Sequence, residues 1–322
     1  MKAIISRKFG PPSVLEITET ERPTPVENQV LIRIMATAIN DYDWAMVRGK
    51  PYEFRFLYGF TRPKHPVPGM ELSGIVEDTG PGVTRFKKGD EVYGDISAYG
   101  FGTFAEYIAI SEDAVLSKPK NMPFTDAAAL PHASLLAYQS LYDHGGLRDG
   151  MKILINGAGG GVGTLGLQLC KQHQTEVTGV DSGEKLGMMS KIGFDHIIDY
   201  KSVNFTKAGV RYDLILDTKS KHSVSSYLRV LTKDGKYVSV GGDTRRILSI
   251  ALMSVYTKKK VSLLALKPNE GLINIEDLYL DGRLTPAIDG PYPFEEIPWA
   301  VQYFGDGKHK GKVVIDMEGS HT

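Results

Sequence analysis

The sequence NGAGGGVG at residues 156–163 constrains the fold of this chain more than any other feature. It stands between a short apolar run, Lys152–Asn156, and an apolar helical pattern, Val162–Cys170. A strand, a glycine-rich turn and a helix in direct succession predict a βαβ unit whose turn passes close to a ligand. Main-chain N–H groups in such a turn approach a diphosphate, and the helix N-terminus adds partial positive charge. We predict that this loop binds a dinucleotide through Gly157, Gly160, Gly161, Val162 and Gly163.

Strands and helices alternate after the glycine loop. The expected strands are Val177–Asp181, His196–Ile198, Leu214–Asp217, Tyr237–Val240 and Val261–Leu266, with a helix at Glu184–Lys191. This alternation predicts an α/β fold with a parallel sheet and helices on both faces. Asp181 ends the strand after the loop helix, at about the 20-residue spacing at which an acidic residue binds a ribose. The alternative is a glycine-rich connector with an exposed aspartate.

The first third of the chain has a different pattern of short strands separated by glycine and proline. The expected strands are Val30–Ile34, Leu72–Val76, Glu91–Gly94 and Thr103–Ile110. They indicate an all-β unit, a barrel, over residues 1–120. A helix over Thr125–Leu141, with Thr125 as its N-cap, then begins the second domain. Near the end, Lys312–Ile315 is expected to be a strand that returns to the first domain.

Composition excludes several classes of function. The 322 residues include 38 Lys and Arg and 38 Asp and Glu, so the net charge of zero argues against a nucleic-acid partner. The single cysteine, Cys170, cannot form an internal disulfide and is expected to be a buried small apolar residue. No apolar run reaches the ~18 residues of a membrane span, and the first residues do not resemble a secretory signal. We therefore expect a cytoplasmic protein.

Five further segments of sequence carry a family resemblance. They are PGMELSGIV at 68–76, FKKGDEVYG at 86–94, GTFAEY at 102–107, ALP at 129–131 with Ala137-Tyr138, and KGKVV at 310–314. Together they resemble the zinc-independent quinone oxidoreductase branch of the medium-chain dehydrogenase/reductase superfamily. The resemblance implies a GroES-like β-barrel domain, residues 1–120 plus 268–322, into which a Rossmann doubly wound parallel sheet, residues 121–267, is inserted.

The resemblance also bears on metal binding. Where zinc-dependent relatives place a Cys, a His and a third ligand, this chain has Asn40, Met70 and His132. Catalytic zinc requires about three protein ligands of the Cys, His or carboxylate type, and Asn and Met are poor substitutes. We therefore predict a site without metal.

Candidate catalytic residues follow from the same resemblance. Asn40 matches an Asn that relatives place beside the nicotinamide, and Asp43 is either the orienter of a proton-relaying water or a helix N-cap. Tyr42, together with Tyr52, is a candidate for an aromatic pocket wall, with burial in the core as the alternative. His132 is either a proton donor or a structural histidine.

The choice of cofactor depends on opposing signals. Relatives that use NADPH hold its 2′-phosphate with residues matching Ser182, Lys185 and Tyr200, whereas the carboxylate of Asp181 would repel a phosphate. Three supporting groups against one lead us to predict NADPH, with NAD as the alternative. The predicted cofactor-binding set also includes Gly241 and Lys312.

Without a metal to activate an alcohol, hydride transfer to an electron-poor acceptor is the chemistry that such a site favours. The sequence therefore predicts an NAD(P)H-dependent reductase of a small-molecule quinone or α,β-unsaturated carbonyl. A zinc-free alcohol or aldehyde dehydrogenase and a catalytically silent NADPH-binding protein are the alternatives. Because relatives dimerise by joining sheet edges that correspond to Val261–Leu266, we also expect a homodimer.

Overall fold

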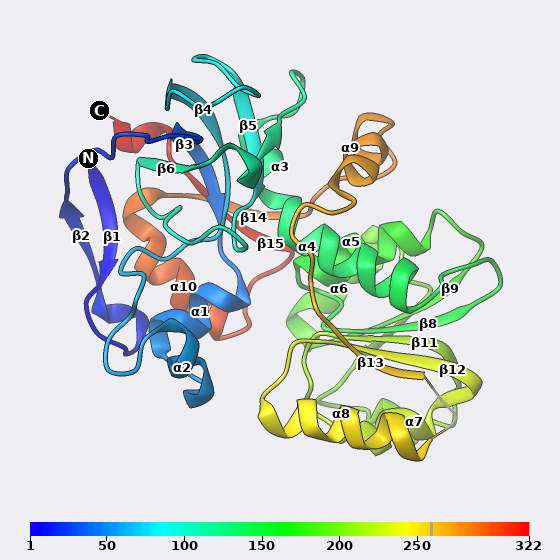
Figure 1. The fold of residues 1–322 in the computed structure, drawn as a ribbon. Helices are drawn as coiled ribbons and strands as arrows, with labels where there is room; N and C mark the ends of the chain where they lie inside the picture. The colour runs from blue at the N-terminus through cyan, green and yellow to red at the C-terminus, as the bar shows by residue number, and fades with distance from the viewer. Residues whose placement is uncertain (258–259, 322) are drawn as a thin grey trace. The chain divides into compact units, whose positions relative to one another are not determined.

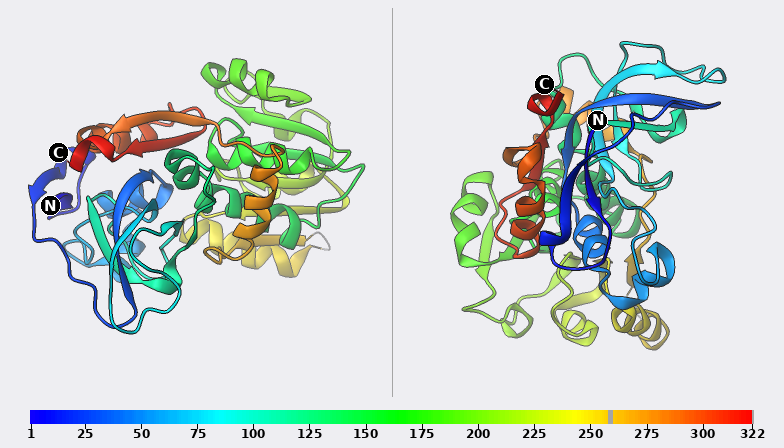
Figure 2. Two further views of the ribbon diagram at one scale, coloured as in Figure 1. Left: turned by 90° about the horizontal axis from the view of Figure 1, so that it is seen from above. Right: turned by 90° about the vertical axis from the view of Figure 1, so that its left-hand side faces the viewer.

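The computed structural model describes residues 1–257 and 260–321, and the chain forms two compact units (Figures 1 and 2). Unit 1 comprises Met1–His132 and Ile288–Thr322, and unit 2 comprises Ala133–Ala287. The predicted boundaries lay earlier in the chain, after residue 120 and before residue 268. No described helix is both long enough and apolar enough to cross a lipid bilayer.

Unit 2 is built on a six-stranded parallel sheet. Its strand order is β10-β9-β8-β11-β12-β13. The strands are β8 (Lys152–Asn156), β9 (Glu176–Asp181), β10 (His196–Asp199), β11 (Tyr212–Asp217), β12 (Leu231–Val240) and β13 (Lys260–Leu264). The helices are α5 (Gly161–Cys170), α6 (Gly183–Ile192), α7 (Val224–Arg229), α8 (Thr244–Tyr256) and α9 (Leu272–Leu280). Figure 1 shows α5 and α6 on one face of the sheet and α7 and α8 on the other, which confirms the doubly wound α/β prediction.

Apolar strands explain why this sheet forms. Ile153, Leu154 and Ile155 of β8 are fully buried, and Leu214, Ile215 and Leu216 of β11 pair with them in parallel register. Continuous apolar runs of this kind are typical of strands that are covered on both faces. Cys170, at the end of α5, is buried as predicted, and burial raises the pKa of its thiol.

Unit 1 is a β-barrel-like unit with a seven-stranded sheet and a hairpin. The sheet has the order β14-β15-β3-β4-β5-β7, with β6 paired to β3, while β1 and β2 form the hairpin. The strands are β1 (Lys2–Ser6), β2 (Leu15–Glu19), β3 (Gln29–Ala38), β4 (Glu71–Thr79), β5 (Glu91–Asp95), β6 (Tyr107–Ser111), β7 (Leu116–Ser117), β14 (Ile288–Pro293) and β15 (Lys312–Asp316). The helices are α1 (Asp41–Arg48), α2 (Arg55–Tyr58), α3 (Phe124–Ala129) and α10 (Ile297–Gly305).

The end of the chain completes the first sheet, as predicted. Val314 of β15 pairs with Ala38 of β3 in antiparallel register, and both are fully buried. The two ends of the chain are close to each other in Figure 2. Lys2 Nζ donates a hydrogen bond to Ser320 O at 3.2 Å. Residues far apart in the sequence thus share one core.

The single helix predicted over Thr125–Leu141 is divided in the structure. It consists of α3, then α4 (Pro131–Tyr138), then a π-helical segment, Gln139–His144. Pro131 begins α4, where its missing N–H and its ring cannot continue the preceding helix. The predicted N-cap was wrong: Pro123 holds that position, and Thr125 lies inside α3.

Candidate functional site

The glycine loop has a backbone that side chains would block. Gly157 has a φ of +91°, and a Cβ there would lie 2.1 Å from Thr218 Oγ1. At Gly163, in the first turn of α5, a Cβ would lie 2.5 Å from the Cα and the carbonyl oxygen of Ala158. The loop can pack this closely only because these two positions carry no side chain.

The N-terminus of α5 follows this loop without a cap of its own. Gly160 is the N-cap residue, and it makes no side-chain capping hydrogen bond to the first turn. The first-turn amides of Gly161, Val162 and Gly163 are the donors that a helix leaves for an external acceptor. A ten-residue helix with an uncapped N-terminus behind a glycine turn fits the diphosphate of a dinucleotide.

Asp181, at the end of β9, is turned toward the glycine loop. Its Oδ2 accepts a hydrogen bond from Gly159 N at 2.9 Å, and its Oδ1 accepts one from Ser182 N at 2.8 Å. Lys185 Nζ lies 3.7 Å from Oδ1, and both side chains are almost fully buried. The carboxylate predicted to face a ribose is thus paired with the ammonium predicted to bind a phosphate.

The other predicted cofactor-binding residues of unit 2 follow the strands β9, β10 and β12. Ser182 precedes α6 as its N-cap, without a side-chain hydrogen bond to that helix. Tyr200, which follows β10, is exposed, and Lys221 Nζ lies 4.4 Å from the centre of its ring. Gly241, which follows β12, has a φ of +74°. All of them follow carboxyl ends of strands, the edge at which doubly wound sheets bind ligands.

Unit 1 contains a buried cluster of polar side chains around Glu71. Its Oε2 lies 2.6 Å from Lys312 Nζ and accepts a hydrogen bond from Asn40 Nδ2 at 3.0 Å, while its Oε1 accepts one from His132 N at 2.7 Å. Lys312 Nζ also donates to Asn40 Oδ1 at 2.5 Å. Because the charges of Glu71 and Lys312 are paired and hydrogen-bonded, the cluster can be buried without an isolated ion.

His132 belongs to the same cluster and has a carboxylate partner. Its Nδ1 lies 2.7 Å from Oδ2 of the buried Asp95. Burial raises the pKa of Asp95, but the charge of His132 and the hydrogen bonds from His132 and Ser97 outweigh it, so that the pKa lies below its usual value. Asp95 therefore favours a proton on Nδ1 and leaves Nε2 to exchange a proton with another group.

Tyr42 lies beside His132. Its ring meets the imidazole edge-on, with 6.2 Å between the ring centres, and it stacks on Phe54. Burial and the charge of Asp95 raise the pKa of Tyr42 above its usual value, although a hydrogen bond from Tyr58 lowers it. The phenol consequently stays protonated at neutral pH. Tyr42 is nevertheless 38% exposed, and Tyr52 is 62% exposed.

Asp43 positions the loop before α1. Its Oδ2 accepts a hydrogen bond from Asn40 N at 2.8 Å, and its Oδ1 accepts one from Gly69 N at 3.0 Å. The alternative of an N-cap was wrong, because Asn40 is the N-cap and Asp43 is the third residue of the helix, in a capping box. Burial raises the pKa of Asp43 to about 7, against the lowering effects of both N–H groups and of Lys312.

The donors at the three positions of the zinc-dependent relatives do not fit zinc. They would be the amide of Asn40, the thioether of Met70 and the imidazole of His132, and two of these side chains already bind Lys312 and Asp95. Within residues 1–257 and 260–321, no group of three or more His, Cys, Asp and Glu could hold a metal ion.

Glu71 and Asp95 were missed as site residues. Glu71 lies in the PGMELSGIV segment next to Met70, and Asp95 follows directly after the predicted strand Glu91–Gly94. A carboxylate beside a motif residue and another at a strand end were signals that could have identified them. Their partners could not be read from the sequence, because the sheet brings Lys312 and His132 to them.

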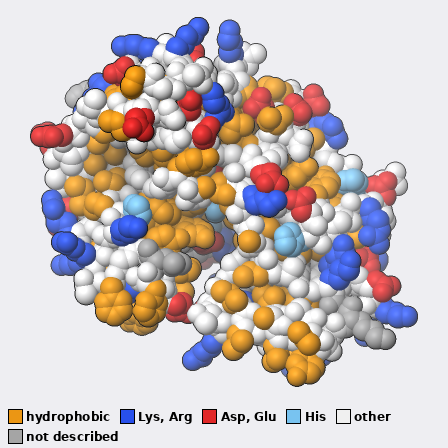
Figure 3. Space-filling view, in the orientation of Figure 1, with side chains coloured by type: hydrophobic (Ala, Val, Ile, Leu, Met, Phe, Trp, Pro, Cys, Tyr) orange, Lys and Arg blue, Asp and Glu red, His pale blue; other side chains and the backbone are white. Residues whose placement is uncertain are grey.

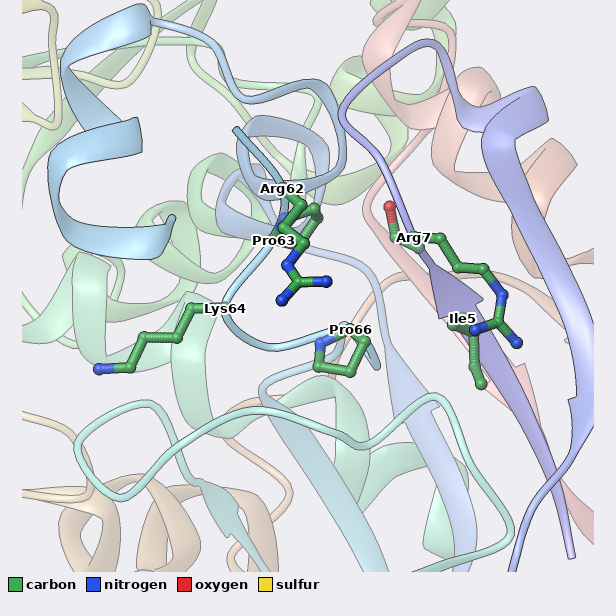
Figure 4. A pocket seen from close by; sticks show the side chains of 7 residues that line it. Ile5, Arg7, Arg62, Pro63, Lys64 and Pro66 are labelled. Carbon is green, nitrogen blue, oxygen red and sulfur yellow. The ribbon is translucent and has the colours of Figure 1, made fainter. Parts of the chain in front are cut away.

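Unit 1 also has an open pocket that includes none of the predicted catalytic residues. Its volume is about 600 Å³, and Figure 4 shows Lys64 and Arg7 extending to opposite sides with Arg62 between them. The other lining residues are Ile5, Ser6, Pro63 and Pro66. The pocket is cationic, and Ser6, a buried polar residue of its lining, donates its hydroxyl to Lys8 O at 3.1 Å.

Comparison with known proteins places these features in a family. Residues 26–120 match the alcohol dehydrogenase GroES-like domain, and residues 192–315 match the zinc-binding dehydrogenase domain. The 2-methylene-furan-3-one reductase of Solanum lycopersicum is 33% identical over 98% of this chain and 79% of its own length. The NADPH-dependent alkenal/one oxidoreductase of Arabidopsis thaliana chloroplasts is 30% identical over the same shares, 98% and 79%.

A solved structure extends the likeness to the whole fold. The quinone oxidoreductase from Coxiella burnetii has a TM-score of 0.88 and 28% sequence identity, over 99% of both chains. The chain belongs to the quinone oxidoreductase branch of the medium-chain dehydrogenase/reductase superfamily.

Proposed function

We propose that this protein is an NAD(P)H-dependent reductase that transfers a hydride to a quinone or an α,β-unsaturated carbonyl. The observation that carries the proposal is the uncapped N-terminus of α5 behind a turn that only glycines can form. Support for the acceptor comes from relatives named as a quinone oxidoreductase, an alkenal/one oxidoreductase and a 2-methylene-furan-3-one reductase. When bound, the reduced nicotinamide supplies the hydride.

The residues of unit 1 supply charge and protons in this proposal. Hydride addition leaves negative charge on an oxygen of the acceptor, and the ammonium of Lys312, in its ion pair with Glu71, provides a fixed dipole rather than a free positive charge. Asn40 accepts from that ammonium and donates both to Glu71 Oε2 and to Ala38 O, so it acts by positioning Lys312. Asp43 in turn holds the backbone of Asn40.

His132 completes the reduction as the proton donor. Asp95 holds Nδ1, so Nε2 is the nitrogen from which a proton is delivered. Replacing His132 with Gln should lower kcat by about 100-fold while the Kd for NADPH stays within about twofold. His173→Gln is the matched control, because His173 lies beside Asp149 on the surface of unit 2. An unchanged kcat in the His132 variant would assign the histidine a structural role.

The proposal is tested by a screen for NADPH oxidation with quinones, alkenals and enones as acceptors. Turnover with at least one conjugated acceptor, and none with simple alcohols and NADP⁺, is the expected result. Oxidation of simple alcohols would instead favour a zinc-free alcohol dehydrogenase. Tight binding of NADPH without any turnover would favour a catalytically silent protein.

Three finer features belong to the same proposal. We infer a preference for NADPH, supported by the relative named as NADPH-dependent, and a reaction without metal, supported by the donor set at Asn40, Met70 and His132. A stoichiometric zinc content in the purified protein would contradict the second. Cytoplasmic location stays a prediction, since the names of two relatives place them in chloroplasts and in mitochondria.

A homodimer is the third feature. β13 pairs only with β12 and forms one edge of the described sheet. Beside it, α8 exposes apolar side chains that Figure 3 shows gathered at the lower end of the molecule: Leu248, Leu252, Val255 and Tyr256. An unpaired strand edge next to an apolar surface favours association with a second copy.

A further inference from the structure

We propose that Lys221 is the cation that selects NADPH over NADH, an inference that rests on the proposed nucleotide-binding function of unit 2. The residue expected in that role, Lys185, has a side chain only 2% exposed and lies 3.7 Å from Asp181 Oδ1. A Cβ at Gly159 would lie 2.6 Å from Lys185 Cδ, so the lysine stem packs against the glycine loop. Its ammonium is used inside the protein and is not presented to a ligand.

Lys221 is placed where a phosphate could reach it. It is exposed in the segment between β11 and α7, and its Nζ lies 4.4 Å from the ring centre of Tyr200, which follows β10. Strands β8 and β9 separate β11 from β10 in the sheet, so the lysine reaches across the carboxyl ends of both. This is the edge at which the glycine loop begins and at which doubly wound sheets bind nucleotides.

The aromatic contact holds the ammonium without neutralising it. Lys221 has no carboxylate within ion-pair distance among the residues that the structure describes. A cation over the face of a tyrosine at an exposed site is held weakly: the contact biases its position but is weaker than a charge-assisted bond to phosphate. A phosphate can therefore replace or share this contact.

The neighbouring charges make this lysine important. Asp181 is paired with Lys185, whereas Asp199 has no ion-pair partner among the residues that the structure describes. Its Oδ1 accepts a hydrogen bond from Lys201 N at 2.9 Å, and its Oδ2 lies 3.0 Å from the position of a Cβ at Gly183, the first residue of α6. An unpaired carboxylate at that edge disfavours a 2′-phosphate unless a free cation offsets it. Without Lys221, the part of this edge beside Tyr200 would favour a ribose hydroxyl over a phosphate.

The test is calorimetric titration of the full chain with NADPH, NADH, 2′,5′-ADP and 5′-AMP. In Lys221→Gln the Kd for NADPH and for 2′,5′-ADP should rise about 10- to 100-fold, the range for loss of one charged phosphate contact. The Kd for NADH and 5′-AMP should change by less than about twofold, because neither carries a 2′-phosphate. Lys221→Arg, which keeps the charge, should restore most of the NADPH affinity. Lys191→Gln, in the last turn of α6, is the matched control and should leave the Kd values for all four nucleotides unchanged.

Failure of this inference is distinct from failure of the proposed function. If the wild-type chain binds NADPH more tightly than NADH and Lys221→Gln keeps that preference, Lys221 is not the selecting cation. An equal loss of NADPH and NADH affinity, or a wild-type preference for NADH, would overturn the inference in the same way. If the wild-type chain binds none of the four nucleotides, the proposed function itself fails.

Discussion

Glu71 shows how single side chains determine the stability of unit 1. Its carboxylate is fully buried and serves three donors at once: the ammonium of Lys312, the amide of Asn40 and the backbone N–H of His132. A buried ion pair adds little net stability over an apolar pair, but the removal of one partner leaves an isolated charge. Glu71 and Lys312 are therefore strongly coupled.

Glu71→Gln should lower the free energy of unfolding by about 3–5 kcal/mol, because it leaves the ammonium of Lys312 without its counter-ion. The double variant with Lys312→Met should recover a large part of that loss. Urea denaturation of both single variants and of the double variant measures the coupling. Glu270→Gln is the control, since Glu270 pairs with Lys267 on the surface, and should cost less than about 1 kcal/mol. Additive losses at Glu71 and Lys312 would show that the two charges are independent.

Asp43 predicts a dependence of stability on pH. Its pKa is raised from 3.8 to about 7 in the folded state, chiefly by burial. Between these values the folded state binds more protons at this carboxyl than the unfolded state does, so the stability contributed by Asp43 is present below pH 4 and is lost as the pH rises to 7. Relative to Asp43→Asn, the wild-type unfolding free energy should fall across this window by on the order of 3 kcal/mol. A pH-independent difference between the two proteins, measured by urea denaturation, would contradict the shifted pKa.

At the scale of elements, strands and helices with local signals were predicted best. The bounds of β8 were correct at both ends, and α5 begins one residue before the predicted Val162. The division of α3 from α4 was missed although Pro131 is a local signal for it. β12 begins at Leu231, earlier than predicted, because the start of the strand is set by the pairing of Leu231 with Tyr212 of β11, whereas the register with β13 begins only at Lys236.

The junction between the glycine loop and α5 is open to a direct test. Gly163→Ala would place a Cβ 2.5 Å from the backbone of Ala158, so the loop must shift. We expect the Kd for NADPH to rise at least about tenfold, because the first-turn amides would no longer be aligned with a diphosphate.

Gly187→Ala provides the matched control for that variant. Gly187 lies inside α6, and a Cβ there meets no atom within 4 Å. The change should leave nucleotide binding unaltered and stabilise the protein by about 1 kcal/mol, since alanine is the better helix former. Equal NADPH affinity in the two variants would show that the glycine loop is not part of the binding site.

At the scale of the whole molecule, the return of the chain end to the first sheet followed from the sequence, whereas the polar cluster did not. The KGKVV segment at 310–314 and its family resemblance predicted a terminal strand in the barrel domain. The pairing of Lys312 with Asn40 and Glu71 depends on the antiparallel register of β15 and β3 and on the position of β4. Register of this kind is a property of the assembled sheet, and a one-residue change would turn Lys312 to the other face.

Association of two copies is the prediction that belongs to this scale. Val255 is 80% exposed on α8, and Val255→Glu would add a charge to the apolar surface beside β13. Light scattering at micromolar concentration should give a dimer for the wild-type chain and a monomer for this variant. Ile17→Glu, on the exposed face of β2 in unit 1, is the control and should leave the dimer intact. A wild-type monomer would reject the interface.

The position of Lys312 also sets an order of events during synthesis. The ammonium that binds Asn40 lies 272 positions later in the chain, after the whole of unit 2. Chains fold from the N-terminus as the ribosome extends them. The strands of unit 2 can therefore pair before β15 has been synthesised and can pair with β3. Until then the carboxylate of Glu71 has no counter-ion and must stay hydrated. The nascent barrel therefore stays open where β15 will pair with β3, and its closure is one of the last steps in the folding of the protein.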